Sequence, residues 1–252
     1  MHTAFVMVSD HETVTEIINR EYRTADIFKR FGIDFCGDEK LPLNIVCRNK
    51  AVNLEVLKKA LNEVSLTHIF ASTKTYNEWS IDFLLDFIVN IHHDYLKKTL
   101  PVIEKYIIEF ATGYNSKFSF IADLKSEFDK LSEVMLPKLQ EEEEIIFPYI
   151  RQIAHAYQNA EPYARLLVRT LRKPLETMML HNHEFTKHIF SELRRLTDNY
   201  YTNKDPCILQ LVLYRKLEEL EIDHSQHIYL ENNILYPQTI AMEKELIMQS
   251  GL

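Results

Sequence analysis

The sequence is short of glycine, with only four among its 252 residues, at Gly32, Gly37, Gly113 and Gly251. The long stretches between them are rich in Leu, Ile, Glu and Lys, which favour helix. No sustained alternation of apolar and polar residues predicts a strand. The scarcity of glycine therefore predicts an all-α fold.

Cysteine is equally scarce. The three cysteines, Cys36, Cys47 and Cys207, are widely spaced and odd in number, so a disulfide framework is not expected and a reducing compartment fits best. No run of about 18 apolar residues exists, and the start MHTAFVMVSDHETV lacks a basic stretch followed by an apolar one. We therefore expect no membrane span, no signal peptide and a cytoplasmic location.

Basic residues are also fewer than acidic residues. Lys and Arg total 29 against 37 Asp and Glu, which gives a net charge of -8. A nucleic-acid-binding surface would need a basic stripe, so this class of partner is excluded. The hydrophobic content of 46% is ordinary for a globular protein and supplies enough apolar residues for a buried core.

Two parts can be separated along the chain. Residues 1–67 predict a small helical N-terminal domain with short helices near 12–21, 23–31 and 53–63, interrupted by the stretch FGIDFCGDEKLPL. Residues 68–78 predict a linker. Residues 79–252 predict four long helices joined by short loops, which favours an antiparallel four-helix bundle. We expect these helices near 80–111, 117–154, 162–199 and 206–247.

An internal repeat relates the second and fourth of these helices. Residues 142–148 read EEEIIFP, and residues 231–237 read ENNILYP. A glutamate, two polar residues, two branched aliphatic residues, an aromatic residue and a proline recur in the same order. The repeat therefore predicts that Glu142 and Glu231 occupy equivalent places on the two helices.

A candidate metal motif lies in the fourth helix. His227 precedes Glu231 by four residues, so the imidazole and the carboxylate share one helix face. Such constellations in a bundle core suit iron or manganese. His224 lies on the same face and extends the motif to HxxHxxxE. A single pair of this spacing also arises by chance on exposed helix faces.

Two further histidines on other helices weaken the chance explanation. His93 lies in IHHDYLKKTLP on the first helix, and His183 lies in MMLHNHEFTKHIF on the third. Adjacent positions on an α-helix differ by 100° and positions two apart by 200°. We therefore expect only one of His92 and His93, and only one of His181 and His183, to face the core.

Five segments together resemble the repair-of-iron-centres family, the iron-sulfur cluster repair di-iron proteins: FKRFGIDFCG, HHDYLKKTLP, EEEEIIFPYI, HNHEF and HIYLENNILYP. Members have a small N-terminal domain followed by a hemerythrin-like bundle. The resemblance covers most of the chain. It implies repair of iron-sulfur clusters damaged by oxidative or nitrosative stress, through iron donation or nitric oxide handling, with damaged iron-sulfur or iron proteins as partners.

The resemblance also implies a di-iron centre with histidine ligands and two bridging glutamates. Carried onto this chain, the ligands are His93, Glu142, His183, His227 and Glu231. The family pattern and the internal repeat both require a histidine four residues before Glu142, where this chain has Lys138. A protonated lysine has donors only and cannot bind a metal ion. We expect the preceding Pro137 to kink the helix or displace its start, and His224 is a substitute ligand.

Three outcomes follow from Lys138. They are an asymmetric site with two irons, favoured by a small margin, a site with one iron, and a metal-free core. In the metal-free core the ammonium would sit against Glu142 and Glu231. The N-terminal domain also departs from the family, since it reads DFCGDEK where adjacent cysteines are usual. Cys36 is then a single thiol, either redox-active or metal-binding, or simply buried.

Two other functions stay open. One is a hemerythrin-type binder or sensor of oxygen or nitric oxide, and the other is a degenerate, metal-free interaction protein. The sequence gives no oligomeric state and leaves a homodimer open.

Overall fold

The computed structural model describes residues 8–33, 41–64, 76–114, 119–161, 183–203 and 207–248. In these ranges the chain forms helices and no strand, apart from an isolated bridge between Thr13 and Pro42. The prediction of an all-α fold is confirmed. The chain divides into two compact units, Met1–Ala71 with Tyr200–Leu217, and Ser72–Asn199 with Glu218–Leu252.

Among its described residues, the first unit holds four short helices and the start of a longer helix at Ile208, and the third short helix was not expected. Pro42 was interpreted as part of a break, but it directly precedes a helix that buries Leu43, Val46 and Cys47. A proline is tolerated at the start of a helix because the first N–H groups have no partner there. The four helices are α1 (Val14–Arg20), α2 (Thr24–Arg30), α3 (Leu43–Asn49) and α4 (Leu54–Val64).

Residues 200–217 belong to the first unit, although the sequence suggested no such association. Within this unit Lys216, which is buried, donates from Nζ to Asp26 at 2.6 Å. Residues 68–75 of the predicted linker lie outside the described residues, and its last residues, Tyr76–Glu78, form the 3-10 turn η1. Cys36 also lies outside the described residues. The domain boundaries given above stay a prediction.

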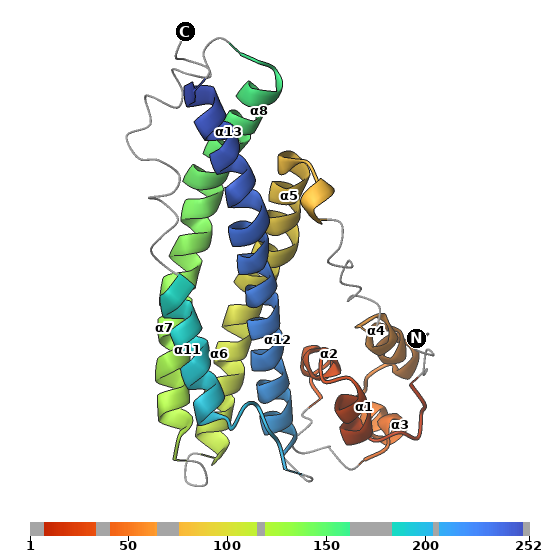
Figure 1. Cartoon of the computed structure of the whole chain (residues 1–252). Helices are drawn as coiled ribbons and strands as arrows, with labels where there is room; N and C mark the ends of the chain where they lie inside the picture. The colour runs from red at the N-terminus through yellow and green to blue at the C-terminus, as the bar shows by residue number, and fades with distance from the viewer. Residues whose placement is uncertain are drawn as a thin grey trace. The chain divides into compact units, whose positions relative to one another are not determined.

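The second unit is built from long helices, three of which contain a π-helical segment. Figure 1 shows their arrangement within this unit. The first is α5 (Ile81–Phe87), η2 (Ile88–His93) and α6 (Asp94–Tyr114). The second is α7 (Ile121–Glu141), η3 (Glu142–Ile146) and α8 (Phe147–Gln158), and the third is α11 (His183–Leu196). The fourth is α12 (Ile208–Leu230), whose residues up to Leu217 belong to the first unit, with η4 (Glu231–Leu235) and α13 (Tyr236–Met248).

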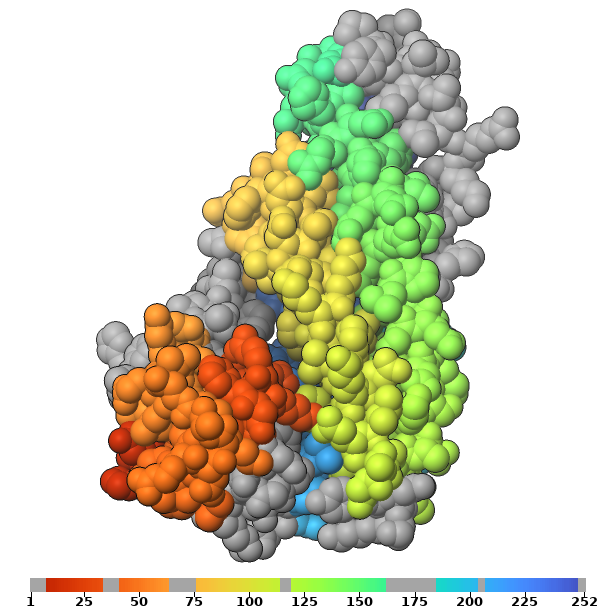
Figure 2. Space-filling model, turned by 180° about the vertical axis from the view of Figure 1, so that it is seen from behind, coloured from red at the N-terminus to blue at the C-terminus, as the bar shows by residue number. Residues whose placement is uncertain are grey.

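These helices pack as neighbours in a bundle. Both α6 and α11 pack against α7, while α5 and α13 pack against α8. In Figure 2 the yellow surface of α5 and α6 runs beside the green surface of α7 and α8. The prediction of a helical bundle is therefore confirmed. Residues 162–182 of the predicted third helix lie outside the described residues. No helix in the described part of the chain is both long and apolar enough to cross a membrane.

The internal repeat corresponds to a repeated local structure. Both copies are π-helical, at Glu142–Ile146 and Glu231–Leu235, and each is followed by a proline, Pro148 or Pro237. A proline cannot donate to the carbonyl four residues earlier, and its ring clashes with that carbonyl. A π-helical turn removes this conflict, because it widens the helix at that point. Pro137 does not have this effect, since α7 continues through it without interruption.

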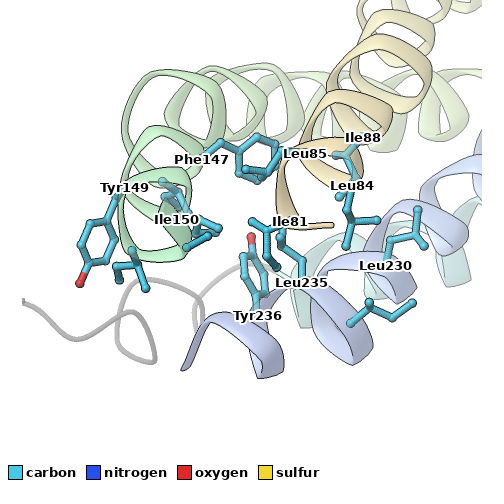
Figure 3. Packing of buried hydrophobic residues seen from close by; sticks show 14 of the residues in the cluster. Ile81, Leu84, Leu85, Ile88, Phe147, Tyr149, Ile150, Leu230, Leu235 and Tyr236 are labelled. Carbon is cyan, nitrogen blue, oxygen red and sulfur yellow. The ribbon is translucent and has the colours of Figure 1, made fainter. Parts of the chain in front are cut away.

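A cluster of buried apolar side chains packs α5, α8 and the fourth helix together. Figure 3 shows Phe147 and Tyr236, the aromatic residues of the two repeat copies, among aliphatic side chains such as Ile81 and Leu85. The Tyr149 hydroxyl points out of this cluster and donates to Glu243 at 2.6 Å. All three π-helical segments border the cluster, so it supports the backbone that carries Glu142 and Glu231.

Candidate metal centre

Four of the predicted ligands meet in the second unit. One ligand atom from each of His93, Glu142, His227 and Glu231 can be chosen so that all four lie within 4.8 Å of one another, and all four residues are buried. The two histidine Nε2 atoms are 3.1 Å apart. Glu142 Oε2 lies 3.4 Å from His93 Nε2, and Glu231 Oε1 lies 3.2 Å from His227 Nε2. Side chains from three helices thus converge on one point.

The ring of His93 is held from outside the cluster by Glu143. Glu143 Oε1 lies 2.7 Å from His93 Nδ1, and Lys97 Nζ donates to both oxygens of Glu143 at 2.7 and 2.6 Å. Burial, together with the nearby His227 imidazole, lowers the pKa of His93 to about 4. A carboxylate only accepts, so the proton of neutral His93 is on Nδ1. The lone pair of Nε2 therefore faces the cluster, ready for a metal ion.

Replacing Glu143 by alanine is expected to weaken metal binding without changing the number of ions bound. Loss of a group that orients a metal-binding histidine typically costs about 10- to 100-fold in affinity. Competition with a metal chelator measures the change. Glu144→Ala is the matched control, because Glu144 accepts a bond from Gln140 instead and faces solvent. Equal affinities of the two variants would contradict the role of Glu143.

Besides His227, both glutamates lie close to a lysine, Lys138. Its Nζ lies 2.9 Å from Glu142 Oε1 and 3.5 Å from Glu231 Oε2. The Lys138 side chain is 12% exposed, whereas those of Glu142 and Glu231 are 1% and 0% exposed. The residue that replaces the expected histidine therefore sits against both carboxylates.

The charges in this cluster are unevenly distributed. Burial and the neighbouring Glu231 raise the pKa of Glu142 well above its usual range. Burial also opposes ionisation of Glu231, but the His227 ring and the Lys138 ammonium hold its pKa below its usual range. For Lys138 burial favours the neutral form, yet the two carboxylates raise its pKa. Lys138 is consequently an ammonium ion and cannot serve as a ligand.

The expectation that only one of His92 and His93 faces the core is wrong. Both are fully buried. His92 Nδ1 lies 3.0 Å from Asp223 Oδ1, and the His92 ring stacks on His227 with centroids 5.9 Å apart. Both rings belong to η2, and a π-helix has more residues per turn, so neighbouring side chains diverge by less than 100°. The bundle interior therefore accommodates both.

The remaining predicted residues lie apart from the cluster or outside the described structure. His224 is buried and lies beside it, with its ring 6.1 Å from the His227 ring and its Nε2 3.2 Å from Thr186 Oγ1. His183 begins α11, but its side chain is not among those described, and Cys36 lies outside the described residues. Sequence reasoning missed Glu143, His92 and Asp223.

The donor set fits a first-row transition metal ion. Two imidazoles and two carboxylates are ligands that suit iron or manganese. Both oxygens of Glu142 and one oxygen of Glu231 are buried without a well-aligned hydrogen bond from the described residues. Buried carboxylate oxygens normally have such bonds, so their absence here is consistent with a site shaped for a cation.

Two family descriptions match the chain. The hemerythrin HHE cation binding domain matches residues 86–239, which include all four clustered residues, and a domain of unknown function (DUF542) matches residues 10–65. The chain belongs to the hemerythrin HHE cation-binding family. This membership and the cluster of histidines and glutamates both indicate iron binding.

Three relatives described as iron-sulfur cluster repair proteins align with most of this chain and with most of their own length. The iron-sulfur cluster repair protein ScdA of Staphylococcus epidermidis is 24% identical over 91% of this chain and 98% of its own length. The iron-sulfur cluster repair protein YtfE of Edwardsiella ictaluri is 25% identical over 87% of this chain and 92% of its own length. A probable iron-sulfur cluster repair protein of Haemophilus influenzae is 24% identical over 85% and 90%.

Proposed function

We propose that this protein is a non-haem iron protein that acts in the repair of iron-sulfur clusters in the cytoplasm. The convergence of His93, Glu142, His227 and Glu231 on one buried point carries the iron-binding part of the proposal. The repair role is supported by relatives that align over nearly the whole chain and bear that name. Clusters damaged by oxidative or nitrosative stress are the proposed targets.

We further propose that the centre holds one iron rather than two. The cluster contains two carboxylates and the Lys138 ammonium. One divalent ion brings the sum of these charges to about +1, while two would bring it to about +3 inside a buried site, where unbalanced charge is costly. Lys138 also occupies the sequence position that should supply the second ion with an imidazole. His93 and His227 then serve the same ion, and His183 is proposed as a further ligand.

Metal analysis of the full chain after anaerobic loading with ferrous iron tests the centre. We expect about one iron per chain for the wild type and less than about one fifth of that for His227→Ala, because the cluster of four ligands loses one of its two imidazoles. His155→Ala is the matched control, since His155 is an exposed histidine on α8. Two irons per chain would overturn the single-ion proposal, and none would overturn iron binding altogether.

The repair role needs a separate assay. Iron-loaded protein is incubated, with an added reductant, with a protein whose [4Fe–4S] cluster has been converted to [3Fe–4S] by peroxide, and recovery of the cluster absorbance is followed. The proposal expects recovery with the wild type and none with His227→Ala. Recovery that is equal for both variants would show that the metal centre has no part in it.

One observation favours a second candidate function, a metal-free interaction protein. The Lys138 ammonium lies close to both buried carboxylates, so it partly neutralises their charge even when no metal ion is bound. In that case the loading experiment yields no bound iron, and addition of iron leaves the thermal stability unchanged.

A further inference from the structure

A groove lined by both polar and apolar side chains, Phe190 and Ile228 among the latter, lies between α11 and the fourth helix (α12 and η4), next to the candidate metal centre. Its cavity volume is about 420 Å³, and all the described residues that line it belong to the second unit. Cavities of this size accommodate small organic ligands. The groove is lined in part by Thr186, Lys187, Arg194, His224, Ser225 and Asn232.

The charge of the groove is opposite in sign to that of the whole chain. Lys187 and Arg194 contribute two positive charges from α11, and Glu221 contributes one negative charge from α12. The chain as a whole carries -8. Two cations at the wall disfavour a free metal ion and favour an anion, whose charge they complement. Neutral gases such as oxygen or nitric oxide would gain nothing from them.

Arg194 is already held in place from the opposite wall. Its Nη1 donates to Glu221 Oε1 at 2.5 Å. This contact engages one terminal nitrogen of a guanidinium that carries five N–H donors in a planar fork. The remaining part of the fork is oriented by that contact, and a planar fork is suited to a carboxylate.

The spacing of the cations points to an extended anion with several carboxylates. Lys187 and Arg194 are seven residues apart on one helix, which corresponds to about 10 Å along the axis at 1.5 Å per residue. An anion with two or three carboxylates can engage each of the two cations with a separate carboxylate. The amide of Asn232 adds a neutral donor along the groove, while the Ser225 hydroxyl donates to the Glu221 carbonyl at 2.7 Å and Thr186 Oγ1 lies 3.2 Å from His224 Nε2.

We propose that this groove binds a small di- or tricarboxylate. The lining includes His224, which is buried and whose ring lies 6.1 Å from the His227 ring. The groove and the candidate metal centre therefore have neighbouring side chains. The proposal does not depend on the centre being loaded, because every residue that it uses lies outside the cluster of four ligands.

Titration calorimetry on the metal-free full chain tests the groove. The probe is tricarballylate, which has the three carboxylates of citrate without its hydroxyl. We expect saturable binding of one molecule per chain. Removal of one charge-assisted contact by Arg194→Gln is expected to weaken it about tenfold, and Lys187→Gln is expected to weaken it similarly. Arg195→Gln is the matched control, because Arg195 is an adjacent exposed arginine paired with Glu192.

Several results would overturn the groove site. They are a lack of saturable binding to the wild type, equal losses in the variants of Arg194 and Arg195, and equally tight binding of inorganic phosphate. Iron content, measured on the same variants, should not change. A chain that binds tricarballylate but no iron would refute the proposed metal centre and leave the groove site standing, so the two failures are distinguishable.

Discussion

Lys138→His is expected to raise the iron content from about one to about two ions per chain. The substitution removes the ammonium and places an imidazole four residues before Glu142, as His227 is placed before Glu231. The new histidine should point at the cluster as His227 does, because Glu142 and Glu231 both begin equivalent π-helical segments. Removing one positive charge also lowers the electrostatic cost of a second cation in the buried site.

The measurement is metal analysis after anaerobic loading and removal of excess iron. Lys130→His on the same helix is the matched control, since Lys130 is an exposed residue paired with Glu127. It should leave the iron content at about one. If the wild type already binds two irons and Lys138→His adds none, then Lys138 does not exclude the second ion and the single-ion proposal fails.

Much of the centre could be predicted because its key residues repeat. The shared order of residues in EEEIIFP and ENNILYP places Glu142 and Glu231 in equivalent positions, and the structure brings both into one cluster. The same comparison identifies Lys138 as the residue that breaks the symmetry. It could not show that the ammonium contacts both carboxylates, because Glu231 is 93 residues away in the sequence. That contact depends on how the helices pack.

Other features were not predicted because ideal α-helical angles between neighbouring side chains were assumed. His92 and Asp223 form a buried pair beside His227, yet an ideal α-helix would direct His92 away from the core if His93 faces it. The π-helical geometry of η2 changes those directions. Glu143 was missed because the sequence does not show that its carboxylate reaches the outer nitrogen of His93, which is 50 residues away on another helix.

The short helix α3 was not predicted because too much weight was given to one residue, the proline that precedes it. Pro42 was interpreted as part of a break in the first unit. A proline disrupts a helix only in its interior, and here it stands immediately before the first turn. The apolar residues of LNIVCRN were the better indication, because three of them are buried on one face.

The metal-free protein is expected to lose about 3 kcal/mol of unfolding free energy on Lys138→Met, because removal of one partner leaves buried carboxylates without their counter-charge. Methionine keeps the length and apolar stem of lysine and removes only the ammonium. Protonation of Glu142, whose pKa is already raised by burial and by Glu231, offsets part of the loss. Urea unfolding of chelator-treated protein measures the change.

Lys125→Met provides the control for this experiment. Lys125 and Asp129 form a pair with the same spacing on the same helix, at 2.6 Å, but in an exposed position. Solvent screens such pairs, so we expect little change in stability. Loading with iron should largely restore the stability of Lys138→Met, since the metal ion then supplies the missing positive charge to Glu142 and Glu231. Similar small losses in the two metal-free variants would show that Lys138 does not neutralise the buried carboxylates, and the charge argument for a single iron would lose its basis.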